Sequence, residues 1–371
     1  MKIGLRLISA GIVTGLLLGL PLIGVRVQGQ PLSQYTEFPP LTRYVEHAGF
    51  SRPIFALFAL VTLALLIPLL IWFAGAIRRR PLRPPAAPFP LWGWAGIALL
   101  LGGWILAWTR FPWAAAIQPF TFSPPWFGYI LVVQALTFRR NGTCRLTSQP
   151  ARFLLLFPVS AAFWWYFEYL NRFVQNWYYV GIGDLSPTGY FWLATLAFST
   201  VLPAVLGTYD LLTAWLGLAA APPRPPRRIP RWFPVGLLAL SAAGLAGLAV
   251  WPNLLFPLLW LAPLLLLSAA RLLAGRPPLD PEPGETLWPR IARLAAAALI
   301  CGFFWEMWNY YSLARWVYAV PYVDRFQLFE MPLLGYAGYL PFGIECALIG
   351  DLVSRRFNGT ARHSNRQGTT Q

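Results

Sequence analysis

Apolar residues in this chain gather into long runs, and short segments rich in arginine and proline separate the runs. A helix needs about 20 apolar residues to cross the hydrocarbon core of a membrane. Ten runs approach or reach that length, and we expect them to form helices at residues 8–25, 54–77, 91–109, 126–138, 153–170, 190–216, 233–251, 254–270, 294–311 and 328–353. The pattern predicts an all-α fold, a polytopic transmembrane helical bundle of about 10 spans.

Composition supports this class and excludes two others. Of the 371 residues, 57% are hydrophobic and 11% are charged, whereas soluble domains carry about 25% charged residues. A water-soluble globule is therefore excluded, and the 19 Trp, 15 Tyr and 26 Phe exclude a disordered chain. The basic residues stand between the apolar runs instead of on one basic domain, so we expect membrane lipids as partners and no nucleic acid.

The basic residues also predict the orientation of the bundle. With ten spans, 22 of the 29 lysine and arginine residues fall on one side of the membrane and 7 on the other. Because cytoplasmic loops carry the excess of positive charge, this distribution places both termini in the cytoplasm. The first run is either an uncleaved anchor, which we favour because no clean cleavage site follows it, or a signal peptide. The other nine spans keep their orientation in both cases.

An internal repeat divides the chain. At a shift of 138 residues Glu168 aligns with Glu306 and Asn171 with Asn309, and in both copies the Glu-x-x-Asn motif follows aromatic residues. An even number of helices per copy gives both copies the same orientation, so two parallel four-helix repeats are expected. The predicted organisation is two leading transmembrane helices with an extracytoplasmic loop (1–90), repeat 1 (91–220), a cytoplasmic linker rich in proline and arginine (221–232), repeat 2 (233–353) and a disordered cytoplasmic tail (354–371). Within the loop, a short amphipathic helix is expected over residues 41–47.

Acidic residues near the spans predict a site. An ionised side chain at the bilayer centre costs about 2.5–3.5 kcal/mol, so such residues should face protein or water. Because Glu168 and Glu306 fall near the outer ends of their helices, we expect a polar pocket on the outer side of the membrane, between the repeats. Its candidate catalytic residues are Glu306, Glu168 and Glu330, and its candidate ligand-binding residues are Asn171, Arg172, Asn309, Arg315, Asp324, Arg325, Trp305, Trp308 and Tyr310. The spacing between Glu168 and Arg172 suits an ion pair within one helix.

Two further points bear on this pocket. Glu345 lies 15 residues beyond Glu330, or roughly 22 Å along a helix, and is therefore a separate intramembrane candidate. The residues of the pocket would also suit an aromatic belt at the membrane interface with structural ion pairs, and the sequence leaves both interpretations open.

Known metal and cofactor motifs are absent from the sequence. The chain has only two histidines, both outside the apolar runs, and its three cysteines lack the spacing of a metal site. Phosphate-binding loops, zinc-protease helices and nucleophile elbows are absent as well. We therefore expect no metal and no cofactor.

Three functions fit such a pocket. The first is binding or modification of a lipid-like or amphipathic ligand, with a glutamate as acid or base and aromatic rings around the ligand. The second is a secondary transporter with exchangeable carboxylates at the repeat interface. The third is a membrane scaffold in which the same residues hold helices together. The sequence ranks them in this order and leaves open whether the protein is an enzyme.

One segment near the C-terminus resembles a known group of proteins. Residues 303–312, FFWEMWNYYS, and residues 328–342, LFEMPLLGYAGYLPF, are similar to a family of bacterial polytopic inner-membrane proteins of uncharacterised function. The resemblance implies a multi-pass protein of the bacterial inner (plasma) membrane, and together with the charge distribution it predicts a cytoplasmic C-terminus. It implies no activity.

Overall fold

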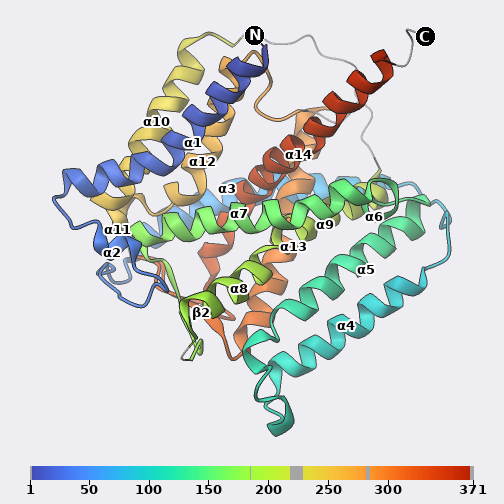
Figure 1. The fold of residues 1–371 in the computed structure, drawn as a ribbon, viewed down its shortest axis with the longest axis horizontal. Helices are drawn as coiled ribbons and strands as arrows, with labels where there is room; N and C mark the ends of the chain where they lie inside the picture. Colours follow the sequence, from blue (N-terminus) through green and yellow to red (C-terminus); the bar gives the residue numbers. More distant parts are fainter. Residues whose placement is uncertain (1, 184, 218–228, 281–284, 368–371) are drawn as a thin grey trace.

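A computed structural model of the chain describes residues 2–183, 185–217, 229–280 and 285–367. Helices make up most of the described chain (Figure 1), and two short two-stranded sheets lie between them. The α-helices are α1 (Lys2–Val27), α2 (Ser33–Thr36), α3 (Arg52–Arg79), α4 (Leu91–Trp108), α5 (Ser123–Asn141), α6 (Arg145–Ser148), α7 (Pro150–Val174), α8 (Pro187–Phe198), α9 (Val201–Leu216), α10 (Trp232–Val250), α11 (Pro252–Leu255), α12 (Leu258–Leu273), α13 (Leu287–Tyr310) and α14 (Tyr339–Gln367). The other elements are the 3-10 helices η1 (Pro112–Ala114), η2 (Gln118–Phe120) and η3 (Leu333–Gly338) and the strands β1 (Trp177–Val180), β2 (Arg315–Tyr318), β3 (Gln327–Leu328) and β4 (Met331–Pro332).

The helices confirm the predicted class of a helical membrane protein. In the described part of the chain, seven helical segments are long and apolar enough to cross a membrane, with α8 and α9 counted as one. Two shorter apolar helical segments, Gly11–Val27 and α12, correspond to two more of the predicted runs. The remaining predicted run, 126–138, lies within the 19 residues of α5.

The helices form a central group flanked by two hairpins. Helices α7, α9, α13 and α14 pack against one another in the centre. The hairpin of α4 and α5 lies on one side of them, and α10 and α12 lie on the other side with α1 packed against α10 (Figure 1). Aromatic rings fill much of the interior. Trp126 on α5, for example, packs on Trp305 and Trp308 of α13 with ring centroids 5.0 and 4.9 Å apart.

Glycines allow the closest approaches between helices. A Cβ at Gly103 of α4 would lie 2.6 Å from Cδ of Pro125 on α5. A Cβ at Gly343 of α14 would overlap the carbonyl of Leu294 on α13. Small residues at helix contacts are typical of membrane proteins, where close van der Waals packing drives association.

The N-terminal loop contains no helix at residues 41–47, so that prediction is wrong. The only helix in this loop is the single turn α2. In residues 41–47, backbone N–H groups bond to side chains instead. Glu37 accepts from the amides of Leu41 and Thr42, and Gln175 accepts from those of Tyr44 and Val45. These side chains satisfy the amides that a helix would have paired internally.

Two of the predicted spans also differ from the structure. The run 190–216 breaks between α8 and α9, where the Ser160 hydroxyl of α7 donates to the Phe198 carbonyl and accepts from the Leu202 amide (2.6 and 2.9 Å). The last run begins as the hairpin of β3 and β4 and η3, so α14 starts at Tyr339 and not at 328. Helix α14 continues through Gln367, whereas the sequence predicts a disordered tail from 354. A helix that has already formed extends without a new nucleus. Residues 368–371 lie outside the described chain.

Candidate functional site

A two-stranded antiparallel sheet joins the two halves of the chain. Strand β1 follows α7 and strand β2 follows α13, and the two pair directly. In their register Trp177 is opposite Tyr318, and Tyr179 is opposite Trp316. Each strand therefore presents a Trp-x-Tyr sequence whose Trp faces the Tyr of the other strand.

An asparagine fixes each strand to the helix before it. Asn309 on α13 donates through Nδ2 to the Trp316 carbonyl (2.7 Å) and accepts at Oδ1 from the Trp316 amide (2.9 Å). Asn171 on α7 makes the same pair of bonds with Trp177, at 2.7 and 3.4 Å. Both asparagines are buried. We call these two arrangements the asparagine clamps.

In the first half, the glutamate of the motif accepts hydrogen bonds from aromatic side chains. Oε1 of Glu168 is bonded to the Tyr179 hydroxyl (2.5 Å) and to the indole N–H groups of Trp177 (3.0 Å) and Trp164 (3.2 Å). Two of these donors stand on β1, the strand that the Asn171 clamp holds in place.

The second half repeats this arrangement with different donors. Oε1 of Glu306 accepts from the hydroxyls of Tyr318 on β2 (2.8 Å) and Tyr339 at the start of α14 (2.9 Å). The indole of Trp316 donates to the Tyr318 hydroxyl at 2.8 Å. The other carboxylate oxygen of Glu306 is buried and accepts no hydrogen bond from the described residues. Glu306 therefore has one carboxylate oxygen without a hydrogen-bond donor among the described residues.

The strand tyrosines act as donors because they stay protonated. Burial, and next the charge of Glu306, raise the pKa of Tyr318 well above its ordinary value. Burial, and next the charge of Glu168, do the same to the pKa of Tyr179. A neutral phenol is a hydrogen-bond donor to a carboxylate over the whole physiological pH range.

A cavity of about 110 Å³ lies between these strands and the neighbouring helices. Its walls come from both halves of the chain and are mostly aromatic and aliphatic. The aromatic side chains lining it are Phe122, Trp164, Trp177, Tyr179, Tyr190, Phe198, Trp260, Trp305, Trp316, Tyr318 and Tyr339. We call it the aromatic cavity. Glu168 and Glu306 are not part of its lining and bond to the rings that are.

The structure brings only some of the predicted pocket residues to this cavity. Trp305 and Arg315 line it, and Arg315 forms an ion pair with Glu330 at 3.5 Å. Arg172 lies elsewhere: instead of pairing with Glu168, it donates to the backbone carbonyls of Gln34, Tyr35 and Glu37 in the N-terminal loop.

The other predicted ligand-binding residues lie away from the aromatic cavity. Asp324 accepts from the side chain of Gln327 (3.1 Å), and the exposed Arg325 stacks over the ring of Phe50 at 5.6 Å. Trp308 is fully buried against Trp126. Tyr310 is 37% exposed and packs on Tyr311 and Phe329.

Glu345 is separate from this site. It is fully buried in α14, and neither of its carboxylate oxygens has a hydrogen-bond partner among the described residues. The buried hydroxyl of Tyr166 on α7 likewise has none. In the described part of the chain, no group of three His, Cys, Asp or Glu side chains is arranged to hold a metal ion.

Sequence reasoning missed several residues that build the cavity. Tyr179 and Tyr339 donate to the two glutamates, and Trp260 closes one wall. The repeat alignment contained a signal for Tyr179, since it aligns with Tyr318. No comparable signal marks Trp260 or Tyr339, which reach the site only through helix packing. No protein-family model, curated protein or solved structure matches this chain in comparisons with known proteins.

Proposed function

We propose that the protein is a multi-pass protein of the bacterial inner membrane, with ten spans, two parallel four-helix repeats and a cytoplasmic C-terminus. The first repeat would consist of α4, α5, α7 and the pair α8 and α9. The second would consist of α10, α12, α13 and α14. Three observations support this arrangement: each half places its hairpin on the outside, each half carries an asparagine clamp, and the two strands pair as copies related by a two-fold axis would. The bias of basic residues supports the orientation.

We propose that the aromatic cavity binds part of a lipid-like or amphipathic ligand. The observation that carries this proposal is the cavity itself, a space at the junction of both halves that is walled by aromatic rings and backed by two buried glutamates. Sites for small molecules are typically about 300–1,000 Å³. A cavity of about 110 Å³ therefore suits the end of an acyl or isoprenoid chain, with the rest of the ligand outside it.

In this proposal Glu306 acts from behind the cavity wall. Its bonded oxygen holds Tyr318 and Tyr339 in that wall, and its second oxygen accepts no hydrogen bond from the described residues, so the carboxyl group is able to take up or release a proton. Glu306→Gln retains an acceptor for these tyrosines and removes the charge. We expect the variant to be expressed normally and to lose function, and we expect the same of Glu168→Gln.

A scaffold role has its own support, because the asparagine clamps and the glutamate bonds hold strands to helices within each half. The two roles differ in whether anything enters the cavity. Enlarging a side chain in its lining would exclude a ligand, whereas the same change on the outer face of that helix would not. Ala197 lines the cavity and Leu196, its neighbour on α8, is exposed, so Ala197→Phe and Leu196→Phe form a matched pair.

The test is photo-crosslinking in membranes that contain a diazirine-bearing phospholipid or isoprenoid alcohol. For the wild type we expect labelled peptides from α7, β1 and β2, a signal retained in Leu196→Phe and reduced at least ~fivefold in Ala197→Phe. Thermal unfolding of the purified variants checks that both are folded. Equal labelling in the two variants, or no labelling of cavity residues in the wild type, would overturn the ligand proposal and favour the scaffold.

A further inference from the structure

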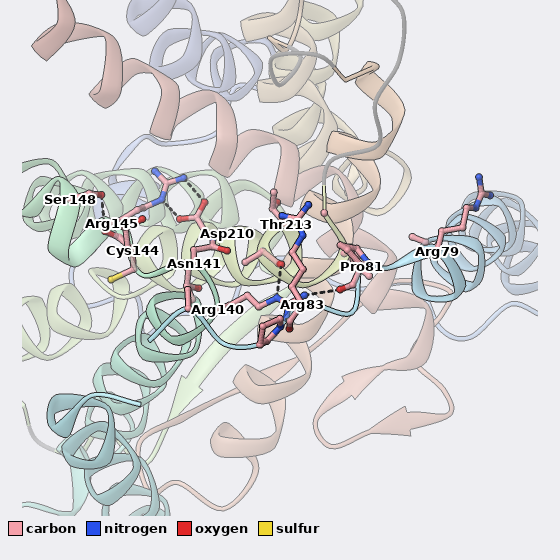
Figure 2. Close-up of a pocket in the computed structure, with 18 of the residues that line it drawn as sticks. Arg79, Pro81, Arg83, Arg140, Asn141, Cys144, Arg145, Ser148, Asp210 and Thr213 are labelled. Atoms are coloured by element: carbon pink, nitrogen blue, oxygen red, sulfur yellow. Dashed lines mark hydrogen bonds and ion pairs between the residues drawn. The ribbon is translucent and has the colours of Figure 1, made fainter. Parts of the chain in front are cut away.

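A second and much larger cavity lies beside the start of α7, whereas the aromatic cavity lies toward its end. Its volume is about 2140 Å³. Its walls are the C-terminal half of α3 with the segment that follows, the end of α5, α6 and the end of α9 (Figure 2). This is the side on which the sequence places the cytoplasm. We call it the arginine cavity because of the residues described next.

Positive charge dominates its lining. Of the residues that the structure describes, five arginines and one aspartate line it: Arg79, Arg83, Arg140, Arg145, Arg152 and Asp210. The formal charge of the lining is therefore +4. Arg145 and Asp210 neutralise each other through two hydrogen bonds, one from Nη2 to Oδ1 at 2.9 Å and one from Nε to Oδ2 (Figure 2). Among the described residues of the lining, no second carboxylate stands beside Arg79, Arg83 or Arg140.

Arg140 is held in place without being neutralised. Its guanidinium donates to the backbone carbonyls of Pro81 (2.8 Å), Ala214 (3.3 Å) and Arg83. Neutral carbonyls fix its position, and no carboxylate of the described residues forms an ion pair with it. The bond to the Arg83 carbonyl also brings Arg83 beside Arg140, as Figure 2 shows. The cavity thus contains a positioned cationic site before any ligand arrives.

The wall changes from cationic to apolar along α3. Arg79 ends this helix, Trp72 lies about 10 Å earlier along its axis and Pro68 about 16 Å earlier, and all three line the cavity. Leu69 is the only residue of α3 that is buried in the described chain. Most of this helix therefore faces the surrounding membrane, and the cavity reaches from the arginines into that apolar region.

We propose that the arginine cavity binds an anionic membrane phospholipid, with the phosphate near Arg83 and Arg140, Arg79 at the rim of the cavity and the acyl chains along α3. Guanidinium groups recognise phosphate through paired hydrogen bonds. The apolar wall fits acyl chains and would not serve a free phosphate ion. Bacterial cytoplasmic leaflets contain anionic lipids, which attract basic residues at the membrane surface. The proposal is independent of the function of the aromatic cavity.

Native mass spectrometry of the full-length protein in a neutral detergent tests the lipid class. The protein is titrated with phosphatidylglycerol, with phosphatidylcholine of the same acyl chains, and with phosphatidylglycerol in the presence of inorganic phosphate. We expect phosphatidylglycerol to bind at least ~tenfold more tightly than phosphatidylcholine, and equimolar phosphate not to displace it. Equal binding of the two lipids would overturn the proposal, and so would displacement by equimolar phosphate, which would indicate a site for the free ion.

A pair of variants tests the location. Arg79 and Arg83 are exposed, and Arg52 is an exposed arginine at the opposite end of α3. Each basic residue near an anionic surface contributes about fivefold in affinity, so the double substitution Arg79→Gln with Arg83→Gln should weaken phosphatidylglycerol binding by about 5- to 30-fold. Arg52→Gln should leave it unchanged. Wild-type affinity in the double variant would overturn the proposal.

A measurement on the wild type covers the case in which the double variant fails to fold. An electrostatic headgroup site weakens as salt screens it. We expect phosphatidylglycerol binding to fall between about 50 and 500 mM salt and phosphatidylcholine binding to stay constant. A salt-independent preference for phosphatidylglycerol would overturn the proposal.

Discussion

Replacing Asn309 by alanine tests the asparagine clamp of the second half. The substitution removes both hydrogen bonds to the Trp316 backbone and leaves a partly buried N–H and a partly buried carbonyl without their partner. A polar side-chain bond in a membrane protein contributes about 0.6 kcal/mol on average, which gives a lower limit of about 1 kcal/mol for two. An unsatisfied buried group costs up to about 3 kcal/mol, which gives an upper limit of about 6 kcal/mol.

We expect Asn309→Ala to lower the free energy of unfolding by about 3 kcal/mol. Asn171→Ala should have a smaller effect, because one of its two bonds is long at 3.4 Å. Asn309→Asp keeps the acceptor for the Trp316 amide but turns an oxygen toward the Trp316 carbonyl, so it should be no more stable than the alanine variant. If polarity alone mattered at this position, aspartate would be tolerated.

Equilibrium unfolding in mixed micelles, followed by tryptophan fluorescence, provides the measurement. Asn141→Ala is the control, because Asn141 is exposed at the end of α5. A loss below about 0.5 kcal/mol for Asn309→Ala would refute the reasoning, since the strand would then hold its position without the clamp. Because β1 and β2 pair with each other, the double variant of Asn171 and Asn309 should depart from additivity.

Two further predictions concern helix packing and pH. Gly103→Ala should lower the free energy of unfolding by about 1–3 kcal/mol, because the added Cβ would press on Pro125. Gly102→Ala is the control and should be neutral, because its Cβ would meet open space. Equal effects of the two substitutions in thermal unfolding would contradict this prediction. Burial lowers the pKa of His47 below its ordinary value of about 6.5, despite its hydrogen bond to the Val174 carbonyl, so the folded state favours the neutral ring. The stability that His47 contributes is therefore complete above about pH 6.5 and is lost as the pH falls through the lowered pKa. Unfolding at pH 7.5 and 5.5 should show a larger loss for the wild type than for His47→Gln, and equal losses would contradict the assignment.

The sequence predicted the helices and the motif because both depend on local patterns. Apolar runs of membrane length and the bias of basic residues need no knowledge of tertiary contacts. The same holds for Glu168 and Asn171, which lie three residues apart on a helix and therefore share one face. The alignment with Glu306 and Asn309 then marked the second copy of the motif.

The rest of the site depends on contacts between distant segments, which local patterns do not contain. The strands β1 and β2 are four residues each and pair across more than 130 residues of chain. Arg293 offers another example: its sequence position predicts that it flanks a span on the cytoplasmic side, yet it is fully buried in an ion pair with Glu285. Only the folded chain brings a neutralising partner to such a charge.

The spacing of the duplicated motif has a physical explanation once the strands are known. On a helix, residues three apart share a face, so the asparagine that clamps a strand stands beside the glutamate one turn earlier. On a strand, residues two apart share a face, so fixing the backbone of Trp316 also directs the side chain of Tyr318. The clamp at Asn309 thereby aims the Tyr318 hydroxyl at Glu306, as Asn171 aims Trp177 and Tyr179 at Glu168. The halves differ in the donor that comes from outside the strand. Glu168 takes it from Trp164 on its own helix, whereas Glu306 takes it from Tyr339 on α14. Because Tyr339 stands on α14, a movement of α14 relative to α13 would change the hydrogen bonding of Glu306 directly.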